Sequence, residues 1–214
     1  MRAPIIVVGG ARSGTTLTMR FLHANGMQVG KSAEINPLVE GKIRDQFYKP
    51  VLEKGGFDKL AQRKLPPPGW DPQVGNVKDR ILDLGEFDDT GLAWGFKGVK
   101  GILMWKALHR AFPEARWVVV SRERGEHVES LLRTPFMTAH TDSVGWNAYL
   151  DEIDAHIESL VSCPEVNCTV FSPSILRDDR KNDQYLEDFC AWCGLVYNPR
   201  SKGVFDRKLY RTNK

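Results

Sequence analysis

Short apolar runs rich in β-branched residues alternate with amphipathic segments along most of this chain. The runs at Ile5–Val8, Trp94–Lys97, Trp117–Ser121 and Cys168–Ser172 are typical of buried strands, and Met27–Val29 is a weaker one. Turn residues or helical periodicity bound each run, as in a parallel sheet. The pattern therefore predicts an α/β fold with a central parallel sheet of about five strands flanked by helices, and with Ile5–Val8 inside the sheet.

Apolar residues at helical spacing predict helices between these strands. The expected helices are Thr15–Ala24, Ile102–Phe112, Glu126–Leu132, Val144–Val161 and Asp183–Cys193. The stretch from Asn36 to Thr90 is a long insertion, which contains the irregular run Pro66-Pro67-Pro68-Gly69. Insertions in α/β enzymes often form the substrate side of the cleft. We expect one domain over residues 1–214, with an insertion at about 36–90 that shapes a substrate site.

Composition and charge narrow the class of protein. The 214 residues are 42% hydrophobic and 27% charged, which is ordinary for a soluble globular protein. A net charge of +3 without a dense basic stripe fits an anionic small-molecule site better than a nucleic-acid surface. No apolar run approaches the length of a transmembrane helix, and Ile5–Val8 is too short for a secretory signal. We expect a cytoplasmic protein without nucleic-acid or membrane partners.

The chain has four cysteines, and one pair has the spacing of zinc ligands. Cys190 and Cys193 are three positions apart, which keeps a zinc site as an alternative. The same two residues recur with Leu186 and Phe189 at helical spacing. This periodicity favours small core residues on an amphipathic helix, so we expect no metal site and no disulfide.

A glycine-rich loop follows the first strand and opens the first helix. In that position, backbone N–H groups and a helix N-terminus point at an anion. Gly9 and Gly14 have the spacing of a P-loop, but Thr15 stands where a Walker A loop has lysine, and Arg12 is a cation within the loop. We expect the loop to bind the phosphate of a nucleotide. The binding residues are Gly10, Ala11, Arg12, Ser13, Gly14, Thr15 and Thr16.

The segment Arg12-Ser13-Gly14-Thr15-Thr16 resembles the 5′-phosphosulfate loop of sulfotransferases that use 3′-phosphoadenosine-5′-phosphosulfate (PAPS). The resemblance implies a P-loop-type fold, with PAPS as sulfuryl donor and adenosine 3′,5′-bisphosphate (PAP) as product. It also implies that the loop wraps the 5′-phosphate and that Arg12 contacts the oxygen bridging to the sulfuryl group. A sulfuryl group carries less charge than a terminal phosphoryl group, so we expect transfer without a metal.

A second motif supports the same resemblance. Arg122 ends a strand and Ser130 follows eight residues later in the next helix, as in the family's nucleotide signature. An arginine at the carboxyl end of a parallel strand faces the ligand crevice, and its fork suits a phosphate. The resemblance implies that the pair binds the 3′-phosphate. The family usually has Arg-Asp-Pro here, whereas this chain has Glu123 and Arg124 after the arginine.

The remaining catalytic residues come from the same comparison. Lys97 matches the family's lysine that stabilises charge on the leaving group, and Lys100 is its competitor. Many cytosolic members use a histidine as base two residues after that lysine, but Val99 stands there. The tyrosylprotein and some bacterial sulfotransferases are similar in placing a glutamate after the second strand, where this chain has Glu34. We expect Glu34 to be the general base, with a surface role and His140 as the alternatives.

Two other functions stay open at this point. A P-loop kinase of a small molecule is the runner-up, although it would need a Walker lysine and an acidic residue for magnesium. The third is an inactive nucleotide-binding or interaction module. The preferred hypothesis is that the protein is a sulfotransferase that acts on a hydroxyl or amine of a small-molecule, carbohydrate or peptide acceptor.

Overall fold

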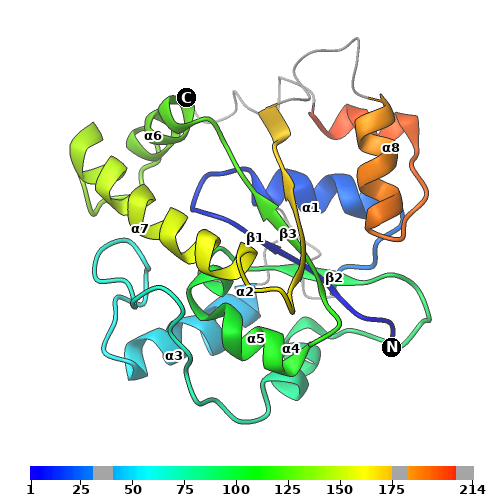
Figure 1. Ribbon diagram of the computed structural model, residues 1–214, viewed down its shortest axis with the longest axis horizontal. Helices are drawn as coiled ribbons and strands as arrows, with labels where there is room; N and C mark the ends of the chain where they lie inside the picture. Colours follow the sequence, from blue (N-terminus) through cyan, green and yellow to red (C-terminus); the bar gives the residue numbers. More distant parts are fainter. Residues whose placement is uncertain (31–40, 175–182, 206–214) are drawn as a thin grey trace.

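Four parallel strands form the centre of the structure, a computed structural model that describes residues 1–30, 41–174 and 183–205 (Figure 1). The strands β1 (Ile5–Val8), β2 (Gly95–Lys97), β3 (Arg116–Val120) and β4 (Asn167–Phe171) lie in the order β2-β1-β3-β4. This confirms the α/β fold, the parallel sheet and the internal position of β1. The segment predicted as a weak fifth strand makes a single parallel bridge, from Gln28 to Trp94, so that the chain only touches the sheet edge there.

The helices flank the sheet close to where the hydrophobic pattern predicts them. Their bounds are α1 Thr15–Ala24, α6 Arg124–Leu132, α7 Ser143–Val161 and α8 Asp183–Trp192. The helix expected over residues 102–112 begins earlier, as the 3-10 helix η3 (Val99–Met104), and continues as α5 (Trp105–Ala111). A second 3-10 helix, η5 (Pro199–Phe205), follows α8. Among the described residues, no helix is long and apolar enough to cross a membrane. The cytoplasmic location stays a prediction.

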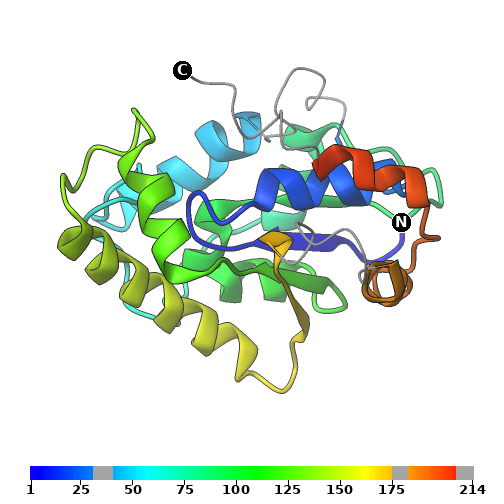
Figure 2. The same ribbon diagram turned by 90° about the horizontal axis from the view of Figure 1, so that it is seen from above.

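Alternate residues of the two inner strands, β1 and β3, pack into two separate cores. Ile6 and Val8 of β1 pack in a core on the side of α5 and α7, whereas Ile5 and Val7 pack in a second core with α1 and α8. Side chains of a strand point alternately to its two faces, and an unbroken apolar run therefore requires cover on both. Figure 2 shows the resulting three layers, with the blue helix α1 above the sheet and the green and yellow helices below it.

The insertion is partly helical and joins the core on the α5 side. It contains α2 (Gly41–Ile43), the π-helix η2 (Arg44–Tyr48), α3 (Lys49–Lys54) and α4 (Val77–Gly85). Tyr48 lies against the carboxyl end of β2, where a Cβ atom added to Gly98 would stand 2.5 Å from its ring. The insertion thus reaches the sheet edge where the candidate site lies. Its expected role in a substrate site, and the single-domain division over 1–214, remain predictions.

The cysteine pair belongs to the core. Cys190 and Cys193 are buried on α8, and burial raises the pKa of the Cys190 thiol to about 12. A zinc ligand must be a thiolate, which this apolar environment disfavours. In the part of the chain that the structure describes, no three His, Cys, Asp or Glu side chains are grouped so that they could hold a metal ion.

Candidate functional site

The loop between β1 and α1 has the backbone conformation of a phosphate cradle. Gly14, the N-cap of α1, is left-handed at φ 112°, and a Cβ atom there would stand 3.0 Å from Pro173 Cγ. Arg12 has φ 69°, a region that few residues other than glycine occupy. Strain of this kind persists where the surrounding structure holds it, and it concentrates at ligand sites. The turn closes with a hydrogen bond from Ser13 N to Gly10 O of 3.1 Å.

Several donors of this loop have no acceptor within the described residues. The first amides of a helix lack partners inside the helix, and those of Gly14, Thr15 and Thr16 make no hydrogen bond to any described residue. Ser13 is 2% exposed, and its hydroxyl likewise meets no described partner. A buried hydroxyl without a partner costs free energy, which a bound anion would recover. The donor set therefore fits a phosphate or phosphosulfate group.

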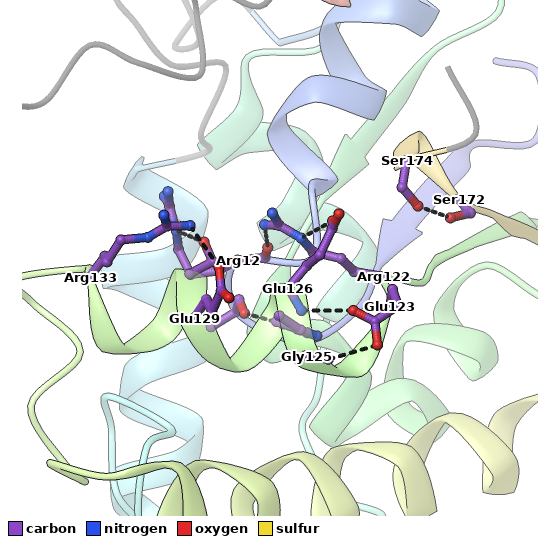
Figure 3. Close-up of polar contacts among 12 residues, drawn as sticks. Arg12, Arg122, Glu123, Gly125, Glu126, Glu129, Arg133, Ser172 and Ser174 are labelled. Atoms are coloured by element: carbon purple, nitrogen blue, oxygen red, sulfur yellow. Dashed lines mark hydrogen bonds and ion pairs between the residues drawn. The ribbon is translucent and has the colours of Figure 1, made fainter. Parts of the chain in front are cut away.

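Three elements bring the predicted anion-binding residues together at the carboxyl edge of the sheet (Figure 3). Arg122 Nη1, at the end of β3, donates to Arg12 O over 3.1 Å, and Arg12 Nε donates to Ser130 Oγ of α6 over 3.4 Å. Ser130 is buried, whereas the Arg12 side chain is exposed. The loop residue expected at the 5′-phosphate thus contacts the serine expected at the 3′-phosphate. A ligand that bridges the two positions would have to replace this contact.

Three arginines gather at this edge of the sheet. Figure 3 shows Arg12, Arg122 and Arg133 near one another above α6, with Glu126 and Glu129 reaching up from that helix toward Arg122 and Arg133. Desolvation and then the two neighbouring arginines lower the pKa of Arg12. The ion pairs with the glutamates are long, at 3.5 Å for Arg122 Nε–Glu126 Oε2 and 3.7 Å for Arg133 Nη2–Glu129 Oε2. Guanidinium groups gathered in this way suit an anionic ligand.

The two residues that depart from the family's sequence after Arg122 have structural roles. Glu123 is the N-cap of α6, and its carboxylate accepts from the amides of Gly125 (2.9 Å) and Glu126 (2.8 Å). These hydrogen bonds hold the pKa of Glu123 below its ordinary value. Arg124 turns to α7 and pairs with two aspartates there. The loss of proline thus leaves the helix start capped and Arg122 in place.

A second layer of side chains supports the loop from below. His127 of α6 is 7% exposed, and its Nε2 lies 2.6 Å from Ala11 O. Tyr149 of α7 is also close to the backbone of Ala11, and burial raises the pKa of its phenol to about 12. The sequence offered one signal for this layer, which is that His127 is three residues before Ser130 and so shares its helix face. Nothing in the sequence pointed to Tyr149.

The two candidate lysines lie in different places. Lys97 is 5% exposed at the carboxyl end of β2, the strand next to the one that carries the loop. Lys100 is half-buried, and its ammonium donates to Leu60 O of the insertion over 2.8 Å. Burial, followed by the nearby Lys49 and Arg44, lowers the pKa of Lys100 to about 8. Of the two lysines, Lys97 therefore stays the candidate for the site, and Lys100 links η3 to the insertion.

Neither candidate base is placed at the loop by the structure. Glu34 lies outside the described residues, so its predicted role stays a prediction. His140 is half-buried on the segment before α7, where its ring meets Trp146 edge to face with the centroids 4.9 Å apart. A Cβ atom on Gly145 would stand 2.5 Å from His140 Nδ1, so the imidazole is packed closely against its own segment.

Comparison with known proteins gives a consistent result for the fold. No protein-family model and no curated protein sequence matches this chain. Among solved structures, a sulfotransferase from Alicyclobacillus acidocaldarius matches with a TM-score of 0.55 at 14% identity, over 100% of this chain and 98% of that one. The sulfotransferase domain from the curacin biosynthetic pathway matches with a TM-score of 0.57 at 12% identity, over 94% and 77% of the two chains.

A third similar structure is the sulfotransferase STF1 from Mycobacterium tuberculosis H37Rv. It has a TM-score of 0.51 at 16% identity, over 96% of this chain and 71% of that one. At such identities the likeness concerns the fold. The chain therefore has the α/β fold that these sulfotransferases share, with a glycine-rich loop after the first strand.

Proposed function

We propose that this protein is a PAPS-dependent sulfotransferase, which transfers a sulfuryl group to a hydroxyl or amine of its acceptor. The observation that carries the proposal is the convergence of Arg12, Arg122 and Ser130, from three separate elements, beside a loop with unpartnered donors. One phosphate would occupy the loop and a second would occupy the arginine–serine pair. A nucleotide with phosphates at both its 5′ and 3′ positions matches this pair of subsites. The shared fold of the similar sulfotransferases supports the same assignment.

The chain's own residues have separate roles in this proposal. The amides of Gly14, Thr15 and Thr16 and the Ser13 hydroxyl bind the 5′-phosphate, and Arg122 and Ser130 bind the 3′-phosphate. When PAPS is bound, the acceptor oxygen or nitrogen forms a bond to sulfur while the bond from sulfur to the bridging phosphate oxygen breaks. Arg12 and Lys97 stabilise the negative charge that develops on that oxygen.

The acceptor proton requires a base, for which we propose Glu34. Its carboxylate would accept the proton as the bond to sulfur forms. Arg12 and Lys97 supply positive charge of the kind that magnesium supplies in kinases, so that transfer requires no divalent metal. Small-molecule, carbohydrate and peptide acceptors all offer the hydroxyl or amine that this chemistry needs.

Ligand titration tests the proposal against the kinase alternative. Isothermal titration calorimetry would compare PAP with ATP plus magnesium on the same protein. We expect PAP to bind at least about tenfold more tightly, because ATP has no phosphate for the Arg122 and Ser130 subsite. Tighter binding of ATP with magnesium would favour the kinase. No binding of either nucleotide would favour a protein without nucleotide chemistry.

A further inference from the structure

His127 makes the shortest hydrogen bond between α6 and the loop. This bond goes to a backbone carbonyl and leaves the N–H groups proposed for the ligand unused. Its Nε2 lies 2.6 Å from Ala11 O, and the carbonyl can only accept, so Nε2 carries the proton. A Cβ atom added to Gly10 would stand 3.1 Å from His127 Cε1. The imidazole therefore packs against Gly10 and also donates a hydrogen bond to the loop backbone.

The backbone carbonyls of two successive loop residues accept hydrogen bonds from side chains outside the loop. His127 donates to Ala11 O, and Arg122 donates to Arg12 O. Tyr149 of α7 is also close to the Ala11 backbone, and burial raises the pKa of its phenol to about 12. Because Ser13 N–H donates to Gly10 O, the amides of Gly14, Thr15 and Thr16 are the ones available to a ligand.

The turn needs such support because its own residues oppose it. Arg12 is left-handed at φ 69°, a conformation that disfavours a side chain with a Cβ atom. Burial, followed by the like charges of Arg122 and Arg133, also lowers the pKa of Arg12. A loop without supporting contacts would relax toward conformations in which its amides no longer converge. Preorganised donors bind an anion more tightly because they need no reordering.

We propose that His127 is a positioning residue, which fixes the phosphate loop in its anion-binding conformation through the hydrogen bond to Ala11 O. This inference rests on the proposed function only for the identity of the nucleotide. The support of the loop itself is a property of the free protein. Loss of the hydrogen bond should therefore loosen the loop before any ligand is added, and weaken the binding of any ligand that uses the loop.

The test compares two amide substitutions of different length. His127→Gln places an N–H₂ group close to the position of Nε2, whereas His127→Asn is one methylene shorter and cannot reach Ala11 O. His156→Asn is the matched control, because His156 is also a buried helical histidine and its Nε2 lies 2.9 Å from Pro66 O, away from the loop. Circular dichroism would establish that each variant is folded.

Two measurements then decide the inference. Hydrogen exchange of the amides of residues 9–16 in the free protein should be about tenfold faster in His127→Asn, and within about threefold of the original in His127→Gln and His156→Asn. The dissociation constants of adenosine 5′-phosphate and of inorganic pyrophosphate should rise about five- to tenfold in His127→Asn alone.

The outcomes separate this inference from the proposed function. Equal exchange and equal affinity in the Asn and Gln variants would overturn the role of His127. If adenosine 5′-phosphate fails to bind the original protein while His127→Asn still speeds exchange of the loop, the nucleotide assignment fails and the role of His127 stands. If His127→Asn does not fold, His127→Phe provides the second test, since it keeps a ring under the loop but cannot donate to Ala11 O, and unchanged exchange of the loop in that variant would count against the inference.

Discussion

Arg122→Ala is the substitution that separates the two phosphate subsites most clearly. The Arg122 side chain is only 16% exposed. Solvent therefore screens its contact with a phosphate only weakly. A charge-assisted hydrogen bond of this kind contributes about 1.5–3 kcal/mol. Glu126 Oε2 lies 3.5 Å from Arg122 Nε and competes with the ligand for the guanidinium. The free energy lost on substitution should therefore lie below the upper end of this range. We expect the lost 3′-phosphate contact alone to cost PAP about 2 kcal/mol, or about 30-fold in its dissociation constant.

The same substitution also removes a support of the loop. Arg122 Nη1 donates to Arg12 O, and this hydrogen bond contributes to the binding of every ligand that uses the loop. Adenosine 5′-phosphate should therefore lose affinity too, by about 0.5–1.5 kcal/mol, the net value of an ordinary hydrogen bond. The preference for PAP over adenosine 5′-phosphate should fall in the variant, and this ratio is the quantity that reports on the 3′-phosphate.

Isothermal titration calorimetry with both ligands measures the ratio, and Arg124→Ala is the matched control. Arg124 is two residues away and equally cationic, but its guanidinium pairs with Asp151 and Asp154 of α7, each at 2.8 Å. Its removal should leave the affinity for both ligands nearly unchanged. If Arg122→Ala weakens PAP and adenosine 5′-phosphate by the same factor, Arg122 does not bind the 3′-phosphate and the reasoning is refuted.

Three further predictions concern turnover and stability. Sulfuryl transfer from labelled PAPS should continue in the presence of a chelator such as EDTA, and loss of turnover there would contradict the role given to Arg12 and Lys97. Glu34→Gln should lower the transfer rate about 10²–10⁴-fold with PAP affinity unchanged, whereas near-normal turnover would make His140 the next candidate base. Burial lowers the pKa of His156 below 6.5, so the unfolded state binds more protons than the folded state in acid. The free energy of unfolding should therefore fall as the pH drops below about 6.5, by up to about 1.4 kcal/mol per pH unit. A Tm that stays constant between about pH 6.5 and 5 would contradict this.

The hydrophobic pattern was sufficient to predict the centre of the fold because the inner strands, β1 and β3, are buried on both faces. Ile5–Val8 forms an unbroken apolar run, and its residues divide between two cores. The helix α1 was predicted to the residue because Asn25 and Gly26 end it. The weak segment at Met27–Val29 formed only a bridge, since a single residue, Gln28, pairs with the sheet. Local sequence could not determine how far that pairing would extend.

The candidate site was predictable where a motif is local and was missed where it depends on packing. Arg122 and Ser130 are found by their spacing around a strand end, and the loop by its glycines. Tyr149 lies 138 residues from Ala11 in the sequence, and only the packing of α7 against α6 brings it under the loop. The role of Glu123 as a helix cap was likewise hidden, because a carboxylate after Arg122 suits a ligand site as well as an N-cap.

A crystal structure of the complex with PAP tests the central claim most directly. The account predicts the 5′-phosphate on the amides of Gly14, Thr15 and Thr16 and on the Ser13 hydroxyl, with the 3′-phosphate on Arg122 and Ser130. In that complex, Arg12 Nε should no longer donate to Ser130 Oγ, which it contacts over 3.4 Å in the present structure. A complex with the 3′-phosphate away from Arg122, or with the nucleotide outside the loop, would contradict the account.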